Sequence, residues 1–169
     1  MKNFFSNGKL QELGRRILNG IFSGGKYLVF SKEIRSYTMR LENVLGCSYS
    51  PTTNQLTVEM SYLGGILSVN RYKWGVFTRP EVRQWMDELA FIIRVMVNSQ
   101  GLKFDVPLKV RVDGIFKDKR ATPDISNCVK VIADSVEDGV GINDRDFVVT
   151  TGEPQIGEEA KLIITIGGI

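Results

Sequence analysis

The chain has 169 residues, of which 43% are hydrophobic, a formal net charge of +3 and no histidine. Without an imidazole it cannot be a hydrolase with a histidine base or a His-ligated zinc protein, so carboxylates, lysine and metal-bound water remain as reactive groups. Two cysteines are too few for a disulfide framework. No signal peptide or apolar run long enough to span a bilayer is evident, so we expect a cytoplasmic protein without a membrane partner.

The N-terminal third is basic. Residues 1–55 contain eight basic and three acidic residues, a net charge of +5, which leaves −2 for the rest of the chain. Apolar periodicity predicts helices over 10–22 and 31–45. We therefore expect residues 1–54 to form a basic, helical extension packed on a body formed by residues 55–169. A basic segment suits DNA, because contacts to phosphates release counterions, although ordinary solvated helix faces would carry the same charges.

The body is predicted to contain strands and helices in one layered fold. Alternating apolar residues predict four strands, over 54–63, 108–116, 146–151 and 161–166. A helix is predicted from Thr78, with Pro80 in its first turn and Glu81 completing a capping box. Its apolar stripe is broad enough to need two covers, for which we expect the sheet and then a second subunit, with the N-terminal helices as the alternative. The expected fold is α+β, a mixed α/β sandwich with a mixed sheet of about four strands.

We expect the chemistry in the stretch from Pro123 to Phe147. On a helical projection, the apolar residues occupy one face: Ile125, Cys128, Val129, Ile132 and Val136. The opposite face carries polar residues: Asp124, Asn127, Lys130 and Asp134. The glycine-containing loop Gly139–Gly141 precedes a second polar cluster, Asn143, Asp144 and Asp146. If the loop folds back, these groups could hold a metal ion and a phosphate.

Phosphodiester hydrolysis requires such groups. It adds negative charge to the phosphate and needs a nucleophilic water, and a hard cation held by carboxylates assists both. We expect Mg²⁺, with Mn²⁺ as a substitute. Lys130 could neutralise developing charge, and Asn127 could orient a carboxylate or a water.

Each of these residues also has an ordinary structural explanation. Asp124 follows Pro123 at a helix start, where an acidic residue caps free amides. Lys130 and Asp134 are four residues apart, as in a surface ion pair, and Asn143 with Asp144 could form a turn. The combination, more than any single residue, favours a site.

The spacing of Asp124, Asn127, Lys130 and Asp134, followed about ten residues later by an acidic doublet, resembles the RusA family of Holliday junction resolvases. The order of the predicted elements is similar as well, and the resemblance covers about residues 55–169. It implies a metal-dependent endodeoxyribonuclease that cuts four-way or other branched DNA as a homodimer, without a nucleotide cofactor. It also implies that Asp124 and Asp144 bind the metal and that Lys130 is essential.

Two positions differ from the family's pattern. Ser126 stands where the family usually has a second aspartate, and Asn143 is the first member of the later doublet. Asp134 or Asp146 could supply the missing ligand. The alternative is a protein that binds branched DNA but is catalytically weakened or inactive, and a third possibility is a phosphodiesterase acting on simpler DNA.

Basic residues near this site are candidates for DNA contacts. Lys117, Lys119 and Arg120 immediately precede Asp124, which would put them beside the phosphate being cut. Arg71 and Lys73 lie farther upstream and are further candidates.

Overall fold

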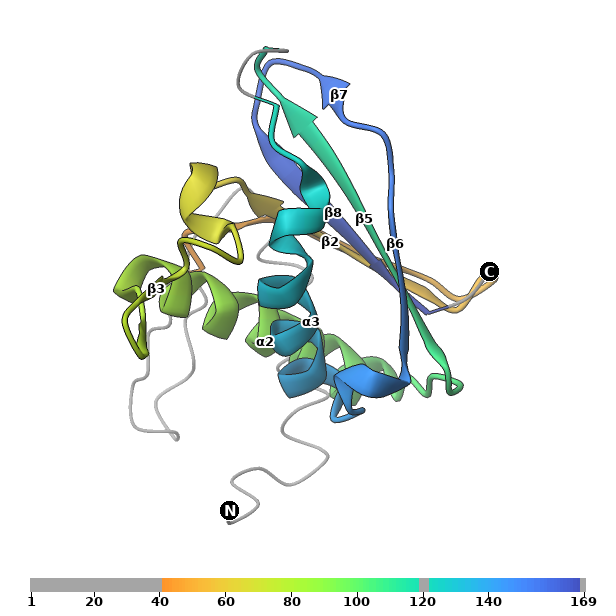
Figure 1. The fold of residues 1–169 in the computed structure, drawn as a ribbon. Helices are drawn as coiled ribbons and strands as arrows, with labels where there is room; N and C mark the ends of the chain where they lie inside the picture. Colours follow the sequence, from red (N-terminus) through yellow and green to blue (C-terminus); the bar gives the residue numbers. More distant parts are fainter. Residues whose placement is uncertain (1–40, 119–121, 168–169) are drawn as a thin grey trace, which may run out of the picture.

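The computed structural model describes residues 41–118 and 122–167. Within them, a mixed β-sheet carries two α-helices on one face (Figure 1), which confirms the predicted α+β fold. The helix predicted over 10–22 and most of the one predicted over 31–45 lie outside the described residues.

The sheet has six strands, in the order β1-β2-β8-β5-β6, with β7 also paired to β5. The strands are β1 (Val44–Ser50), β2 (Gln55–Ser61), β5 (Leu108–Phe116), β6 (Phe147–Thr151), β7 (Gln155–Ile156) and β8 (Lys161–Ile166). Pairing is parallel between β5 and β6 and between β5 and β7, and antiparallel elsewhere. All four predicted strands are present, and β1 and β7 are additional.

The strand β1 corrects the prediction for the end of the 31–45 helix. Val44 and Leu45 belong to β1, which pairs with β2, so the sheet begins within residues 1–54. Just before β1, the backbone N–H and the side-chain amide of Asn43 donate to the carboxylate of Glu88, at 2.7 and 3.2 Å. Glu88 is fully buried and also accepts from Gln84 at 2.9 Å, so its side-chain oxygens have hydrogen-bond partners where β1 meets the helix layer.

The first described α-helix starts later than predicted. A hairpin of β3 (Lys73–Trp74) and β4 (Phe77–Thr78) precedes α2 (Pro80–Gln100). Thr78 pairs with Lys73 across this hairpin, and the N-cap residue Arg79 makes no side-chain cap bond. The predicted capping box is therefore wrong, because β pairing holds the threonine outside the helix.

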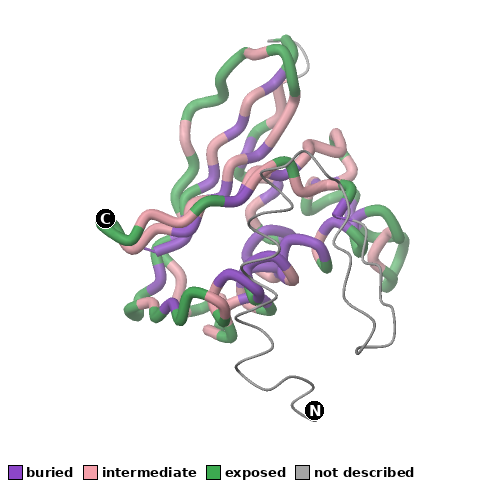
Figure 2. Tube along the Cα trace, turned by 180° about the vertical axis from the view of Figure 1, so that it is seen from behind, coloured by how far each residue is buried: buried purple, intermediate pink, exposed green. Residues whose placement is uncertain are grey.

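The core lies between the sheet and the helices. Along β5, alternate residues from Leu108 to Val112 are buried, as predicted. Figure 2 shows the buried positions following the central strands and the parts of the helices that face them. The broad stripe of α2 packs on the sheet and on α3 (Val129–Val140), which is its second cover. The width of the stripe is thus accounted for within the described chain and carries no argument for a second subunit.

The two helices approach each other closely at Gly139. A Cβ atom there would lie 2.8 Å from side-chain atoms of Ile93 and 3.1 Å from the carbonyl oxygen of Ala90. Only a residue without a side chain fits this contact.

Among the described residues, no helix is both long and apolar enough to cross a membrane.

We predict that Gly139→Ala lowers the free energy of unfolding by about 1–2 kcal/mol, because overpacking costs about 1–3 kcal/mol and alanine's better helix propensity returns at most about 1 kcal/mol. Urea unfolding would measure the change. The control is Asp138→Ala, at the exposed neighbouring position, which should stay within about 0.5 kcal/mol of the parent. If the Gly139 variant and the parent had the same free energy of unfolding, the two helices could move apart without a loss of stability.

Candidate active site

The helix α3 is the crossover between the parallel strands β5 and β6. The 3-10 helix η2 (Ile125–Cys128) leads into it, and η3 (Asp144–Asp146) follows it directly before β6. Gly141 ends α3 with φ 76°, a left-handed conformation that glycine adopts without strain. The chain therefore turns back at this point, as predicted, and brings Asp144 beside the helix.

Lys130 lies between two carboxylates. Its Nζ is 2.6 Å from Asp134 Oδ1, one turn along α3, and 3.2 Å from Asp144 Oδ2 after the turn. The lysine side chain is half exposed. Its hydrogen bonds to Asp134, and secondarily to Asp144, raise the pKa of the ammonium above its usual value. The ammonium form of Lys130 can stabilise negative charge that develops beside it.

A third carboxylate, Glu137, belongs to the same cluster. Asp134, Glu137 and Asp144 each offer an oxygen, and these oxygens lie within 4.8 Å of one another. Asn143 donates from Nδ2 to Glu137 Oε1 at 3.1 Å. Glu137 is not among the site residues predicted from the sequence, although its position three residues after Asp134 places both on one side of a helix.

Asp124 sits at the start of the helical segment and has a capping role. Its Oδ1 accepts a hydrogen bond from the Ser126 backbone N–H at 3.0 Å. Hydrogen bonding to the Ser126 side chain, and then to its backbone, lowers the pKa of the Asp124 carboxyl. Asp124 is thus ionised at neutral pH, and Ser126 supports that charge. Among the described residues, Asp124 does not belong to the group formed by Asp134, Glu137 and Asp144.

Asn127 connects η2 to the segment before the hairpin. Its backbone N–H donates to the Asp124 carbonyl at 3.0 Å, and its carbonyl accepts from the Val69 N–H at 2.7 Å. The main chain of Asn127 therefore has a structural role.

Asp146 is the remaining acidic candidate. Its Oδ2 lies 3.9 Å from Arg145 Nε, in an ion pair in which both side chains are well exposed.

The predicted DNA-contacting residues that the structure describes lie in two places. Lys117 is exposed just after β5, and Arg71 and Lys73 are exposed at the base of the hairpin. Lys119 and Arg120 lie outside the described residues. The structure thus brings together Lys130, Asp134 and Asp144 from the predicted set, adds Glu137, and leaves Asp124 at the head of the helix.

The acidic cluster has the donor set and charge for a divalent cation. Three carboxylates and one ammonium give a net charge of −2, which one such ion would balance. Oxygen ligands are those that Mg²⁺ prefers, and it needs only one or two carboxylates because it retains several waters. The residues present therefore fit the expected metal.

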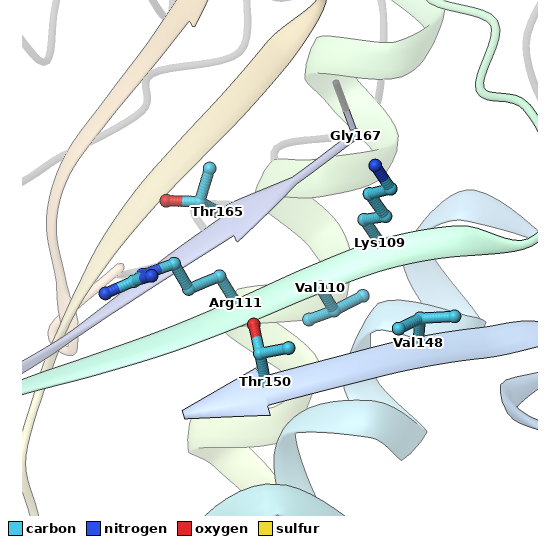
Figure 3. A pocket seen from close by; sticks show the side chains of 7 residues that line it. All are labelled: Lys109, Val110, Arg111, Val148, Thr150, Thr165 and Gly167. Atoms are coloured by element: carbon cyan, nitrogen blue, oxygen red, sulfur yellow. The ribbon is translucent and has the colours of Figure 1, made fainter. Parts of the chain in front are cut away.

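A pocket of about 240 Å³ lies elsewhere, on the face of the sheet away from the helices. Figure 3 shows Lys109 and Arg111 of β5 projecting on that face, together with Thr150 of β6 and Thr165 of β8. The guanidinium of Arg111 is engaged with Asp113, with Nε 2.8 Å from Oδ2. None of the residues predicted for the site line this pocket.

Comparison with known families gives one finding for this chain. The family Endodeoxyribonuclease RusA matches residues 67–167, which is more than half of the chain. The match includes α2, β5, α3, η3 and β6, and thus every described residue of the acidic cluster. No curated protein matches the chain significantly. The agreement of this match with the predicted motif shows that the chain belongs to the RusA endodeoxyribonuclease family.

Proposed function

We propose that this protein is a magnesium-dependent endodeoxyribonuclease that cuts Holliday junctions or other branched DNA as a homodimer. The observation that carries the proposal is the position of Lys130 between Asp134 and Asp144 in a chain of this family. It unites a fixed positive charge with carboxylate oxygens, which is the combination that phosphodiester hydrolysis requires.

Asp144, Asp134 and Glu137 are the proposed metal ligands of the described cluster. A bound Mg²⁺, or Mn²⁺ in its place, would supply charge neutralisation at the phosphate and an acidified water. Asp124 remains in the proposal as a further ligand on the family resemblance, supported by its lowered pKa. Asp146 has no proposed role.

Lys130 is the proposed contact to the scissile phosphate. Its ammonium already lies 2.6 Å from one carboxylate and 3.2 Å from another, so it is oriented before substrate arrives. An ammonium has three donors, and the third can reach a phosphate oxygen while two stay on Asp134 and Asp144. Because this charge is present throughout the reaction, it favours the more negative transition state. Asn127 is proposed to orient a neighbouring oxygen ligand through its side chain.

The proposed homodimer follows from the symmetry of the substrate. A four-way junction offers two equivalent strands, so a two-fold dimer with one site per subunit can cut both. The proposed DNA contacts of the described chain are Lys117, Arg71 and Lys73, which are exposed and can neutralise phosphates.

A second candidate function is binding of branched DNA without cleavage. Ser126 and Asn143 favour it, because both stand at positions where the family has carboxylates. Fewer anionic ligands weaken the affinity for Mg²⁺, so such a protein would keep the DNA-binding surface and lose turnover.

The first prediction from the proposed function concerns Asp144. The parent should nick a labelled four-way junction symmetrically with Mg²⁺ and leave linear duplex of the same sequence intact, and Asp144→Asn should lose this activity about 100-fold or more because a ligand charge is gone. Cleavage with Mg²⁺, with Mn²⁺ and with chelator would be compared on gels. Asp138→Asn, which changes an exposed carboxylate of α3 outside the acidic cluster, is the matched control and should cut like the parent.

The outcomes separate the two candidate functions. If the parent binds the junction tightly and does not cut it with either metal, the protein is a binding protein and the nuclease proposal fails. Equal cleavage by the parent and Asp144→Asn would leave the nuclease assignment standing and remove Asp144 from the site.

The second prediction concerns Lys130. Lys130→Gln should slow cleavage about 100- to 1000-fold, the usual loss on removing one group that stabilises transition-state charge. The same change should tighten Mg²⁺ binding in the absence of DNA, because the cluster goes from a net charge of −2 to −3. Calorimetric titration with Mg²⁺ and a cleavage assay would test both effects. A parallel loss of Mg²⁺ binding would mean that Lys130 acts by holding the ligands in place.

The third prediction concerns Ser126. Ser126→Asp restores a carboxylate at the family's position, so it should increase Mg²⁺ affinity and lower the Mg²⁺ concentration needed for half-maximal cleavage. Ser126→Asn, of similar size and without charge, is the control and should give no gain. If the aspartate variant requires more Mg²⁺ than the parent, repulsion with Asp124 outweighs the new ligand.

A further inference from the structure

The hairpin formed by β3 and β4 exposes an unusual amount of apolar surface. Trp74 is 57% exposed, Val76 83% and Phe77 76%. Trp74 and Phe77 are directly opposed across the two strands, so their side chains lie on the same face of the hairpin. Two aromatic rings are thus exposed to solvent side by side. Adjacent exposed apolar side chains of this kind are typical of a binding surface.

The hairpin has a defined conformation. Its two-residue loop is Gly75-Val76, and Gly75 has φ 59°, the left-handed conformation that the first loop position of a tight hairpin requires. Arg79 closes the base: its backbone N–H donates to the Tyr72 carbonyl at 2.9 Å, and its Nε donates to the Arg71 carbonyl at 2.6 Å. The exposed rings are therefore held in place before any partner binds.

The charge around the rings is positive. The Arg79 guanidinium lies 4.5 Å from the centre of the Trp74 ring, and Lys73 and Arg71 are adjacent in the chain. From Met60 to Pro80 the sequence contains these three basic residues and no acidic one. Aromatic side chains among basic ones are typical of surfaces that bind the bases and backbone of unpaired nucleic acid, where every base offers a ring face for stacking.

The hairpin is also connected to the proposed active site. The Val69 N–H donates to the Asn127 carbonyl at 2.7 Å, and the Tyr72 N–H donates to the Ser68 carbonyl at 2.9 Å. Asn127 belongs to η2, whose N-cap is Asp124. The base of the hairpin is thereby hydrogen-bonded to the segment that leads into α3.

We propose that this hairpin recognises the branch point of the DNA, with Trp74 and Phe77 stacking on base faces that are exposed there and with Lys73 and Arg71 contacting the adjoining phosphates. This inference rests on the proposed function, because it assumes a branched DNA substrate. In linear duplex the base faces are covered by their neighbours, and only a branch, an end or a single strand exposes them. The hairpin would therefore add affinity for branched DNA and little for duplex.

The test is binding of the full-length chain, in chelator so that no strand is cut, to a four-way junction with 2-aminopurine at the branch point and to linear duplex. Trp74→Ala and Phe77→Ala should each weaken junction binding about 10-fold or more, the loss expected for one stacked base, and change duplex binding about twofold at most. Trp74→Phe keeps an aromatic ring and should retain most of the affinity. Ile156→Ser, at a 50% exposed apolar residue of β7, is the control and should bind like the parent.

Intrinsic fluorescence provides an independent signal. Of the two tryptophans, Trp85 is fully buried and Trp74 is exposed, so quenching by a stacked base should come from Trp74 and be absent in Trp74→Phe. The 2-aminopurine signal should change with the parent and not with Trp74→Ala. Sedimentation of the free variants should match that of the parent.

Three results would overturn the inference. Unchanged junction affinity in Trp74→Ala and Phe77→Ala, with a parent that binds and cuts junctions, would reject the hairpin and leave the proposed function intact. A changed association state of these variants would identify the hairpin as a contact between protein chains. A parent that neither binds nor cuts branched DNA would reject the proposed function and this inference with it.

Discussion

The contact of Lys130 with Asp134 and Asp144 determines the arrangement of the candidate site. It joins the first turn of α3 to the loop that follows the helix, and it places a positive charge among three carboxylates. Without that charge, the three acidic groups within 4.8 Å would repel one another. Half-exposed ion pairs contribute at most about 1 kcal/mol each to stability, so this contact organises the site more than it holds the fold. The fold itself depends on the β5–α3–β6 crossover and on the close approach of α2 and α3 at Gly139.

The two departures from the family pattern have a common physical effect. The side chain of Ser126 hydrogen-bonds with the carboxylate of Asp124 and lowers its pKa, and the side-chain amide of Asn143 donates to the carboxylate of Glu137. At each position, a hydrogen-bond donor to a carboxylate replaces what would have been a second negative charge. The substitutions therefore lower the repulsion within the site at the cost of ligand charge. In the proposed function, the balance between these two effects decides between cleavage and binding alone, and a measured affinity for Mg²⁺ would report on it.

Asn127 stands between two regions with different proposed tasks. On one side, the carboxylates and Lys130 supply charges for hydrolysis, and on the other, the β3–β4 hairpin supplies exposed rings and basic groups. The backbone hydrogen bond from Val69 to Asn127 links them. A rigid link of this kind would hold a bound branch point at a constant position relative to the phosphate to be cut, which is how orientation contributes to rate.

The sequence by itself determined the fold class, four of the six strands of the sheet and the shared helix face of Lys130 and Asp134. Alternation along 108–116 predicted β5 at its observed boundaries, and helical spacing predicted that Lys130 and Asp134 share a face. These features depend on local periodicity, which the order of neighbouring residues in the chain sets. Tertiary structure decided the rest. Thr78 pairs with Lys73 and lies outside the helix, and Val44 and Leu45 belong to a strand. The helix α3 packs on α2, and Glu137 belongs to the acidic cluster. In each case the deciding partner lies in another element of the fold, and no local pattern can show which distant partner a residue will meet.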